Sequence, residues 1–194
     1  MTWSAKRDAP NESESLDLIN ACKDTLDRLV VLLPLKCGMR ISECSHLNRH
    51  WCDFEKKLIT LPPSQRCGCW ECRTLRRSIW APKSEAGERS LIMTPDVERA
   101  LMELFAAADG INRSRRALEC RFSKILERSG GQRRVYPHAL RAAHATRLAE
   151  NNLSAPSLAY VMGWASIEPS EAYIQSSMKR AHQELRQVYA RAAV

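Results

Sequence analysis

"YPHALRAAHATRLAE", from Tyr136 to Glu150, predicts a helix whose first turn carries an imidazole and a guanidinium side by side. Pro137 stands where helices commonly begin, because its missing N–H would have no intrahelical partner there. His138 and Arg141 are three residues apart, so they share one face of that helix. A solvated basic first turn has the same pattern, so the rest of the chain must decide between an ordinary surface and a site.

Apolar spacing and turn signals predict further elements on both sides of this helix. One helix is expected from Leu16 to about Leu35, with Gly38 at its end and Ser42 opening the next short helix. Strands are expected at 56–63, 78–83 and 89–93, and further helices at 94–108, 117–129, 157–162 and 178–193. The order of helices, strands and helices predicts an α+β domain that is mainly helical, with a small three-stranded antiparallel sheet.

Length and charge limit the function classes. The 194 residues suffice for one sizeable domain, and we expect a flexible arm at 1–13 followed by that domain at 14–194. Thirty Lys and Arg against 22 Asp and Glu leave a net charge of +8, which favours a polyanion partner such as nucleic acid. No apolar run approaches the ~20 residues that span a bilayer, and the N-terminus lacks the apolar core of a signal peptide. We therefore expect no membrane partner, a location in the cytoplasm or nucleoid of a host cell, and cysteines that are reduced or bind metal.

Several polar residues stand at the ends of the predicted elements. Arg40 lies in "GMRISE" with Glu43 three residues on, and Lys83 ends a predicted strand in "PKSEAGERSLIM". Trp164 follows Gly163, and Tyr173 comes nine residues after Trp164, beyond a predicted turn through Pro169. Together with the pair at the start of the 136–150 helix, these residues form a set suited to the attack of a phenol on a phosphodiester.

In this order and spacing the motifs resemble the catalytic domain of the tyrosine recombinases, the phage integrase family. The resemblance covers about Leu16 to Gln187. The family's first arginine motif matches "GMRISE", its hairpin lysine matches Lys83 with Gly87 and Arg89 behind it, and its His-x-x-Arg box matches the 136–150 helix. Its position for His or Trp after Gly is Trp164, and its nucleophile is Tyr173. Taken singly, Lys83 is more typical of a solvated strand end and Trp164 of a core, and only the joint pattern indicates a site.

The resemblance implies a role for each matched residue. Arg40 and Arg141 would clamp the non-bridging phosphate oxygens, and Glu43 would pair with a basic residue to hold the cluster. Tyr173 would attack and form a 3′-phosphotyrosine, which stores the bond energy without ATP.

Proton transfers are divided among the remaining matched residues. His138 would act as base or orienter, and Lys83 would protonate the departing 5′ oxygen. The indole N–H of Trp164 can only donate a hydrogen bond. No metal or other cofactor is required for this chemistry.

Two features depart from the family pattern. The N-terminal core-binding domain usual in the family is expected to be absent, because only about 15 residues precede the domain. Either the chain is a fragment of a longer protein or it binds DNA with half of the family's clamp. Ala142 stands where the family often has His, and His144 is expected to face elsewhere on the helix.

A cysteine-rich insertion, "CGCWEC", is a third departure. Cys67, Cys69 and Cys72 invite Zn²⁺ in a structural site, with Cys52 or His50 as a fourth ligand, or remain free thiols on an exposed hairpin. Insertions of this kind resemble those of archaeal-type viral integrases, although the acidic composition of salt-loving organisms is missing. The other helix cysteines are expected in the core, namely Cys22, Cys37, Cys44 and Cys120.

The resemblance implies a site-specific DNA recombinase, an integrase of a virus or other mobile element that acts on double-stranded DNA. The expected assembly is a monomer in solution and a tetramer on DNA, joined through the predicted helix at 178–193. The alternative for this helix is that it folds back onto its own chain. Two alternatives are a type IB topoisomerase-like relaxase, which uses the same residues on one duplex, and a DNA-binding accessory protein with a vestigial site. An intact set that includes Tyr173 argues against the accessory protein, because binding alone needs no nucleophile.

Overall fold

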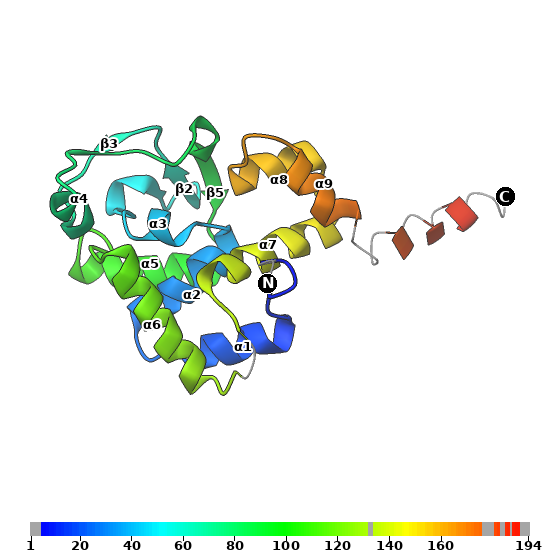
Figure 1. The fold of residues 1–194 in the computed structure, drawn as a ribbon, viewed down its shortest axis with the longest axis horizontal. Helices are drawn as coiled ribbons and strands as arrows, with labels where there is room; N and C mark the ends of the chain where they lie inside the picture. Colours follow the sequence, from blue (N-terminus) through cyan, green and yellow to red (C-terminus); the bar gives the residue numbers. More distant parts are fainter. Residues whose placement is uncertain (1–4, 132–133, 176–180, 183–184, 187, 191–194) are drawn as a thin grey trace.

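The computed structural model describes residues 5–131, 134–175, 181–182, 185–186 and 188–190. Its elements follow in chain order as α1 (Glu12–Asn20), α2 (Thr25–Cys37), α3 (Ile41–Cys44), η1 (Arg49–Trp51), β1 (Cys52–Asp53), β2 (Leu58–Leu61), β3 (Gln65–Arg66), α4 (Trp70–Thr74), β4 (Ile79–Trp80), η2 (Glu85–Gly87), β5 (Arg89–Ile92), α5 (Pro95–Ala107), α6 (Arg115–Arg128), α7 (Pro137–Glu150), α8 (Ala155–Met162) and α9 (Glu168–Gln175). The mainly helical α+β class predicted from the sequence is confirmed (Figure 1). None of the helices in these ranges combines the length and the hydropathy needed to cross a bilayer.

Helix α2 is the centre of the core. Val30, Val31 and Leu33 are all fully buried, so the helix is covered on every side rather than along one stripe. Helices α5, α6 and α7 pack against it (Figure 1). Gly38 ends α2 with a left-handed φ of +66°, a conformation that favours glycine. The tight turn at Gly38 sets the direction in which the chain continues toward α3.

The prediction of one helix from Leu16 to about Leu35 was wrong, because two helices occupy this stretch. Helix α1 starts at a capping box in which Asn11 and Glu14 satisfy each other's backbone N–H groups. Helix α2 starts at Asp24, whose side chain accepts from the backbone N–H of Asp27. The apolar spacing continues across the break because both helices bury a face in the same core.

The three-stranded sheet exists, but one of its strands differs from the prediction. Strands β2 and β5 pair antiparallel, with Ile59 opposite Leu91, as expected from the stretches 56–63 and 89–93. The third strand is β1, which pairs with β2. The predicted strand at 78–83 was wrong as a sheet member, since only Ile79–Trp80 forms β4 and pairs with β3 in a separate two-stranded sheet. The cysteine-rich insertion thus forms its own hairpin, anchored by Trp80, whose ring packs at a tilt against Trp51 with centroids 4.9 Å apart.

The C-terminal half follows the predicted helices closely. Helices α5, α6, α7 and α8 occupy the stretches expected for them, and Gly163 ends α8 with φ +57°. The turn expected through Pro169 was wrong, because this proline lies in the first turn of α9, where its missing N–H costs little. The predicted helix at 178–193 falls largely outside the described residues.

Candidate active site

The tight turn after α2 places Arg40 at the start of α3. The backbone N–H of Arg40 donates to Glu43 Oε2 at 2.7 Å, and Arg40 Nη1 donates to Glu43 Oε1 at 2.8 Å. One carboxylate therefore fixes both the backbone and the side chain of Arg40. The spacing of three residues makes this possible, because it brings the acid back to the first residue of the helical turn.

Glu43 also forms a buried ion pair with Arg89 at the start of β5. Arg89 Nη2 donates to Oε2 at 2.8 Å and Nη1 donates to Oε1 at 3.1 Å, and both residues are 2% exposed. Burial alone would raise the pKa of the Glu43 carboxyl, but the hydrogen bonds and charge of Arg89, together with the charges of Arg40 and Arg141, hold it below its usual value. The sequence pointed to Arg89 only as a residue that accompanies the hairpin lysine, and its role in joining the sheet to α3 was missed.

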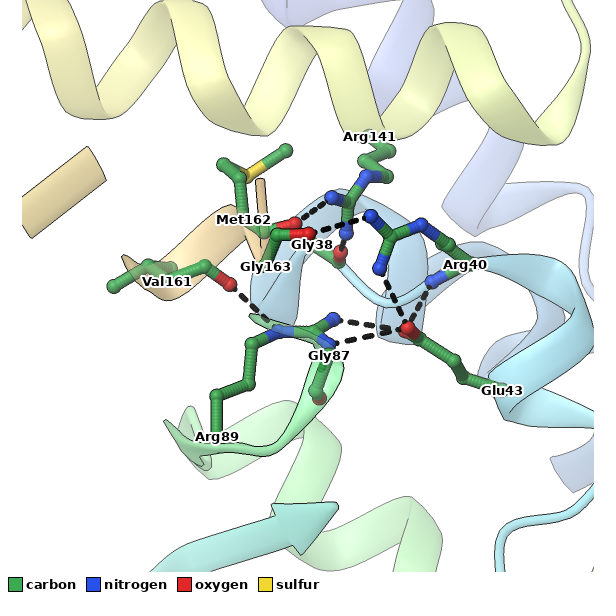
Figure 2. Close-up of polar contacts among 9 residues, drawn as sticks. All are labelled: Gly38, Arg40, Glu43, Gly87, Arg89, Arg141, Val161, Met162 and Gly163. Atoms are coloured by element: carbon green, nitrogen blue, oxygen red, sulfur yellow. Dashed lines mark hydrogen bonds and ion pairs between the residues drawn. The ribbon is translucent and has the colours of Figure 1, made fainter. Parts of the chain in front are cut away.

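Three guanidiniums converge on the C-terminal end of α8 (Figure 2). Arg89 Nε donates to the carbonyl of Val161 at 2.9 Å, Arg40 Nη2 donates to the carbonyl of Gly163 at 2.7 Å, and Arg141 Nη2 donates to the carbonyl of Met162. The last carbonyls of a helix have no intrahelical partner and carry the negative end of its dipole. This helix end therefore acts as a shared acceptor that aligns the arginines.

Arg141 is the most deeply placed cation of the cluster. It is 2% exposed, and its second donor, Nη1, bonds the carbonyl of Gly38. Burial and the nearby charge of Arg40 lower the pKa of Arg141 to about 9, with Glu43 opposing, so the side chain stays cationic at neutral pH. Within the described part of the chain, no carboxylate lies in ion-pair range of it. Three guanidiniums against one carboxylate leave an excess of two positive charges, which favours an anion as the remaining partner.

A pocket of about 580 Å³ opens beside this cluster and brings together four of the predicted residues, Arg40, Lys83, His138 and Arg141. Lys83 is exposed and lies in the loop after β4 instead of at the end of a strand. Partial burial and the charges of Arg141 and Arg40 lower the pKa of His138, although its side chain still reaches solvent. A neutral imidazole beside two guanidiniums can accept a proton at neutral pH.

Trp164 and Tyr173 form a stacked pair that does not line this pocket, although Tyr173 lies close enough to Arg141 for that charge to act on its pKa. Their ring centroids are 5.6 Å apart with an interplanar angle of 17°. Helix α9, which carries Tyr173, packs against α7 and α8 of the same chain. Burial raises the pKa of Tyr173, and the nearby charge of Arg141 opposes that rise. Lys6 Nζ lies 5.1 Å from the centre of the Tyr173 ring and donates to the carbonyl of Ala172 at 2.7 Å, so the segment expected to be an arm touches α9.

His144 lies away from the pocket, as its position on α7 predicted. Its ring is buried beneath Gly38, where an added Cβ would lie 2.8 Å from His144 Cδ2. Burial, followed by the charges of Arg147 and Arg141, lowers the pKa of His144 to about 4. The imidazole is therefore neutral at physiological pH and belongs to the packing under the α2 end.

The cysteines only partly follow the sequence predictions. Cys37 and Cys44 are buried and Cys22 is half-buried, but Cys120 is exposed, so the prediction that it belongs to the core was wrong. The fourth member of the cysteine cluster was also predicted wrongly, as Cys52 or His50. The ligand atoms of His46 lie with those of Cys67, Cys69 and Cys72, all within 4.8 Å of one another. His46 carried no local sequence signal, because it precedes the insertion by more than twenty residues.

Residues 11–180 match the phage integrase family. This chain belongs to the phage integrase family. The membership covers most of its length and confirms the family predicted from the motifs.

Curated relatives carry the name tyrosine recombinase XerC. The protein from Chlamydia muridarum is 26% identical over 159 residues, covering 79% of this chain and 47% of the relative. The protein from Chlamydia caviae is 28% identical over 163 residues, covering 81% of this chain and 50% of the relative. The chain thus spans about half the length of the curated relatives it matches. An archaeal or viral origin stays a prediction.

Solved structures of the phage integrase family share the fold. The XerA recombinase superposes with a TM-score of 0.67 at 21% identity, covering 95% of this chain and 63% of that one. The Tn1549 transposon integrase in complex with transposon right end DNA gives a TM-score of 0.67 at 20% identity, covering 92% and 64%. The catalytic domain of bacteriophage HP1 integrase gives 0.61 at 15% identity, covering 92% of this chain and 93% of that domain. The described architecture is therefore that of a tyrosine-recombinase catalytic domain.

Proposed function

We propose that this chain catalyses site-specific recombination of double-stranded DNA, cutting and rejoining strands through a 3′-phosphotyrosine. The observation that carries the proposal is the pocket in which Arg40, Lys83, His138 and Arg141 converge. Tyr173 lies close enough to Arg141 for that charge to act on its pKa. Residues 14–194 would form the catalytic domain. The XerC name of its relatives and the DNA-bound transposon integrase among similar folds support a DNA substrate.

The arginines would bind the scissile phosphate. Each guanidinium has planar donors that match the non-bridging oxygens, and the excess positive charge of the cluster becomes more favourable as negative charge builds up on phosphorus. Arg40 and Arg141 are already held by the backbone carbonyls of Gly163, Met162 and Gly38, so little reorganisation is needed when the phosphate arrives. Preorganisation of this kind is the usual source of large electrostatic rate effects.

Tyr173 would attack the phosphorus while its phenolic proton passes to His138 or to water. The bond from phosphorus to the 5′ oxygen breaks, and Lys83 would protonate that oxygen as it leaves. Trp164 would hold the Tyr173 ring by stacking and could donate its N–H to the phosphate. Attack by a 5′ hydroxyl of a second strand would then reverse the step and release the tyrosine. None of these steps needs a metal ion.

A selection experiment tests the proposal without knowledge of the target site. The protein is incubated with a pool of nicked duplexes of randomised sequence, in which the cleaved end diffuses away and traps the covalent species. Covalent protein–DNA complexes are recovered under denaturing conditions, and mass spectrometry locates the modified residue. We expect enrichment of a common sequence and attachment at Tyr173. Recovery of no covalent complex would support a vestigial site and contradict the proposal.

The reaction products distinguish a recombinase from the alternative, a type IB topoisomerase-like relaxase. A recombinase joins strands from two different duplexes that carry the selected sequence, and we expect it to assemble as a tetramer on them. A relaxase changes only the linking number of a single supercoiled plasmid. Relaxation without any strand exchange between two labelled duplexes would therefore overturn the recombinase assignment. Strand exchange between sites on two separate DNA molecules would support a role in integrating a virus or other mobile element, because integration requires that reaction.

A further inference from the structure

Four metal-ligating side chains meet where the cysteine-rich insertion touches the segment after α3. The ligand atoms of His46, Cys67, Cys69 and Cys72 lie within 4.8 Å of one another, and His46 Nε2 lies 3.3 Å from Cys72 Sγ. Three sulfurs and one imidazole nitrogen form a soft ligand set that suits tetrahedral Zn²⁺. Bonds of about 2.3 Å to sulfur place neighbouring sulfurs about 3.8 Å apart in such a site, a spacing that the observed cluster admits with small side-chain adjustments.

The environment of His46 orients its free nitrogen toward the cysteines. Nδ1 lies 2.8 Å from the carbonyl of Ser42 and 3.0 Å from Ser45 Oγ. Because a carbonyl only accepts, the proton is assigned to Nδ1, and the lone pair of Nε2 faces the cluster. A metal-bound histidine usually donates its other ring N–H to a backbone carbonyl or carboxylate in this way. The ring also stacks on Trp80 with centroids 5.4 Å apart, which restrains its rotation.

The three cysteines come from one short connection between β3 and β4. Cys67 follows β3, and its backbone N–H donates to the carbonyl of Ser78, the residue before β4. Cys69 stands before α4, and its sulfur accepts from the backbone N–H of Cys72 at 3.4 Å. The chain therefore wraps the sulfurs around one point. All four coordination positions would be filled by protein side chains, which is typical of a structural site and leaves no open position for catalysis.

We propose that His46, Cys67, Cys69 and Cys72 bind one Zn²⁺ that joins the β3–α4–β4 insertion to the segment after α3. The insertion contributes Trp80, and the loop after β4 contributes Lys83, to a pocket of about 290 Å³ whose other wall is formed by Arg40, Glu43 and His46. The zinc ion would thus fix the loop that carries Lys83 relative to the arginine cluster. This role is separate from strand transfer, and its test does not depend on recombination.

Metal content tests the site directly. The full chain, purified under reducing conditions with zinc supplied, should contain one equivalent of zinc by elemental analysis. His46→Ala and Cys72→Ser should each lose most of it, whereas His46→Cys, which restores four soft ligands, should retain it. Cys120→Ser is the matched control, because Cys120 is exposed and lies outside the cluster. Absence of zinc from the unsubstituted protein, or full retention by His46→Ala, would overturn the proposal.

Two further measurements use the unsubstituted protein and therefore do not depend on whether a variant folds. Cobalt in place of zinc should give the intense visible absorption of a tetrahedral ion and a thiolate-to-cobalt charge-transfer band in the near ultraviolet. Removing the metal with a chelator should accelerate tryptic cleavage after the exposed residues Arg73, Arg76 and Arg77, while cleavage after Arg28 on α2 stays unchanged. A weak octahedral cobalt spectrum, or cleavage rates at 73–77 that ignore the chelator, would contradict a zinc tether at this place.

Discussion

Tyr173 differs from the other described tyrosines in its surroundings. It is half-buried, stacked on Trp164 and close enough to Arg141 for that charge to act on its pKa. Tyr173→Phe removes one oxygen and should abolish covalent trapping on nicked DNA while DNA binding and stability stay nearly unchanged. Tyr160→Phe is the matched control, because Tyr160 is exposed and should be dispensable. The assay is denaturing electrophoresis of labelled DNA, and a Tyr173→Phe protein that still attaches covalently would contradict the assignment.

The same residue decides whether one subunit or two build the site. Since α9 packs against α7 and α8 of its own chain, we expect Tyr173 to act on the phosphate bound by its own arginines. Mixing Tyr173→Phe protein with Arg141→Ala protein should therefore restore no cleavage, because neither chain has a complete site. Recovery of cleavage in the mixture, measured against each variant alone, would mean that the tyrosine is donated to a neighbouring subunit.

Lys83 is exposed on a loop, so its removal should spare the fold. Lys83→Ala should slow cleavage by about 10²–10⁴-fold, the usual contribution of general acid–base catalysis, with little change in DNA affinity. A substrate whose 5′ leaving group is sulfur needs little protonation and should recover most of the rate. Lys56→Ala, another exposed lysine in a weak surface ion pair, serves as the control. Equal slowing on the oxygen and sulfur substrates would exclude Lys83 as the acid.

At the scale of elements, Glu43 joins α3 to β5 through its partly buried pair with Arg40 and its buried pair with Arg89. Glu43→Gln leaves buried guanidinium charge uncompensated and should lower the unfolding free energy at pH 7 by about 3–5 kcal/mol. The pKa of Glu43 is lowered in the folded protein from its ordinary value of 4.5, so the stabilisation is complete above that pH and is lost as the pH falls through the folded value. The difference in unfolding free energy between the unsubstituted protein and Glu43→Gln should therefore become smaller as the pH falls.

Denaturant unfolding at a series of pH values measures this effect. Glu103→Gln is the control, since its ion pair with Arg28 is exposed and such pairs contribute about 0–1 kcal/mol. If the difference in unfolding free energy for Glu43→Gln stays constant from pH 7 to acidic pH, the charge of Glu43 does not stabilise the contact between α3 and β5.

The elements that local signals define were predictable, and those that depend on pairing were not. The 136–150 helix follows from Pro137 and α5 follows from Pro95, because a proline at the first helical position acts within one turn. The cap expected at Thr94 is not formed, since its side chain makes no capping hydrogen bond. Strand β4 was assigned to the wrong sheet because a strand's partner is chosen by the whole fold. Order and spacing along the chain were enough to single out the four predicted residues that meet at one pocket, whereas His46 reaches the cysteines only through tertiary packing.

The whole molecule carries a net charge of +8, and basic side chains, including Arg115 and Arg134, extend the rim of the candidate pocket. DNA binding should therefore weaken with salt, with log K falling by about 0.9 per log unit of salt for each phosphate contacted. Arg134→Ala should reduce that slope by about one contact, and Arg28→Ala, on α2 and paired with Glu103, should leave it unchanged. Fluorescence anisotropy across a salt series provides the slopes. Tight binding that is independent of salt would contradict a phosphate-facing pocket.

The hydrogen-bond acceptors at the end of α8 are main-chain carbonyl oxygens. Side-chain mutagenesis therefore cannot remove them. Every amino acid supplies a carbonyl, so a saturation scan of positions 161 and 162 would report the packing of Val161 and Met162 and never the loss of an acceptor. Chemical synthesis can reach what codons cannot. An ester in place of the amide that joins Gly163 to Trp164 weakens the carbonyl that receives Arg40 while keeping every side chain. The same change removes the N–H of Trp164, which donates to the carbonyl of Ala159. A semisynthetic protein of this kind would show how much the backbone carbonyls contribute to holding the arginine side chains in place.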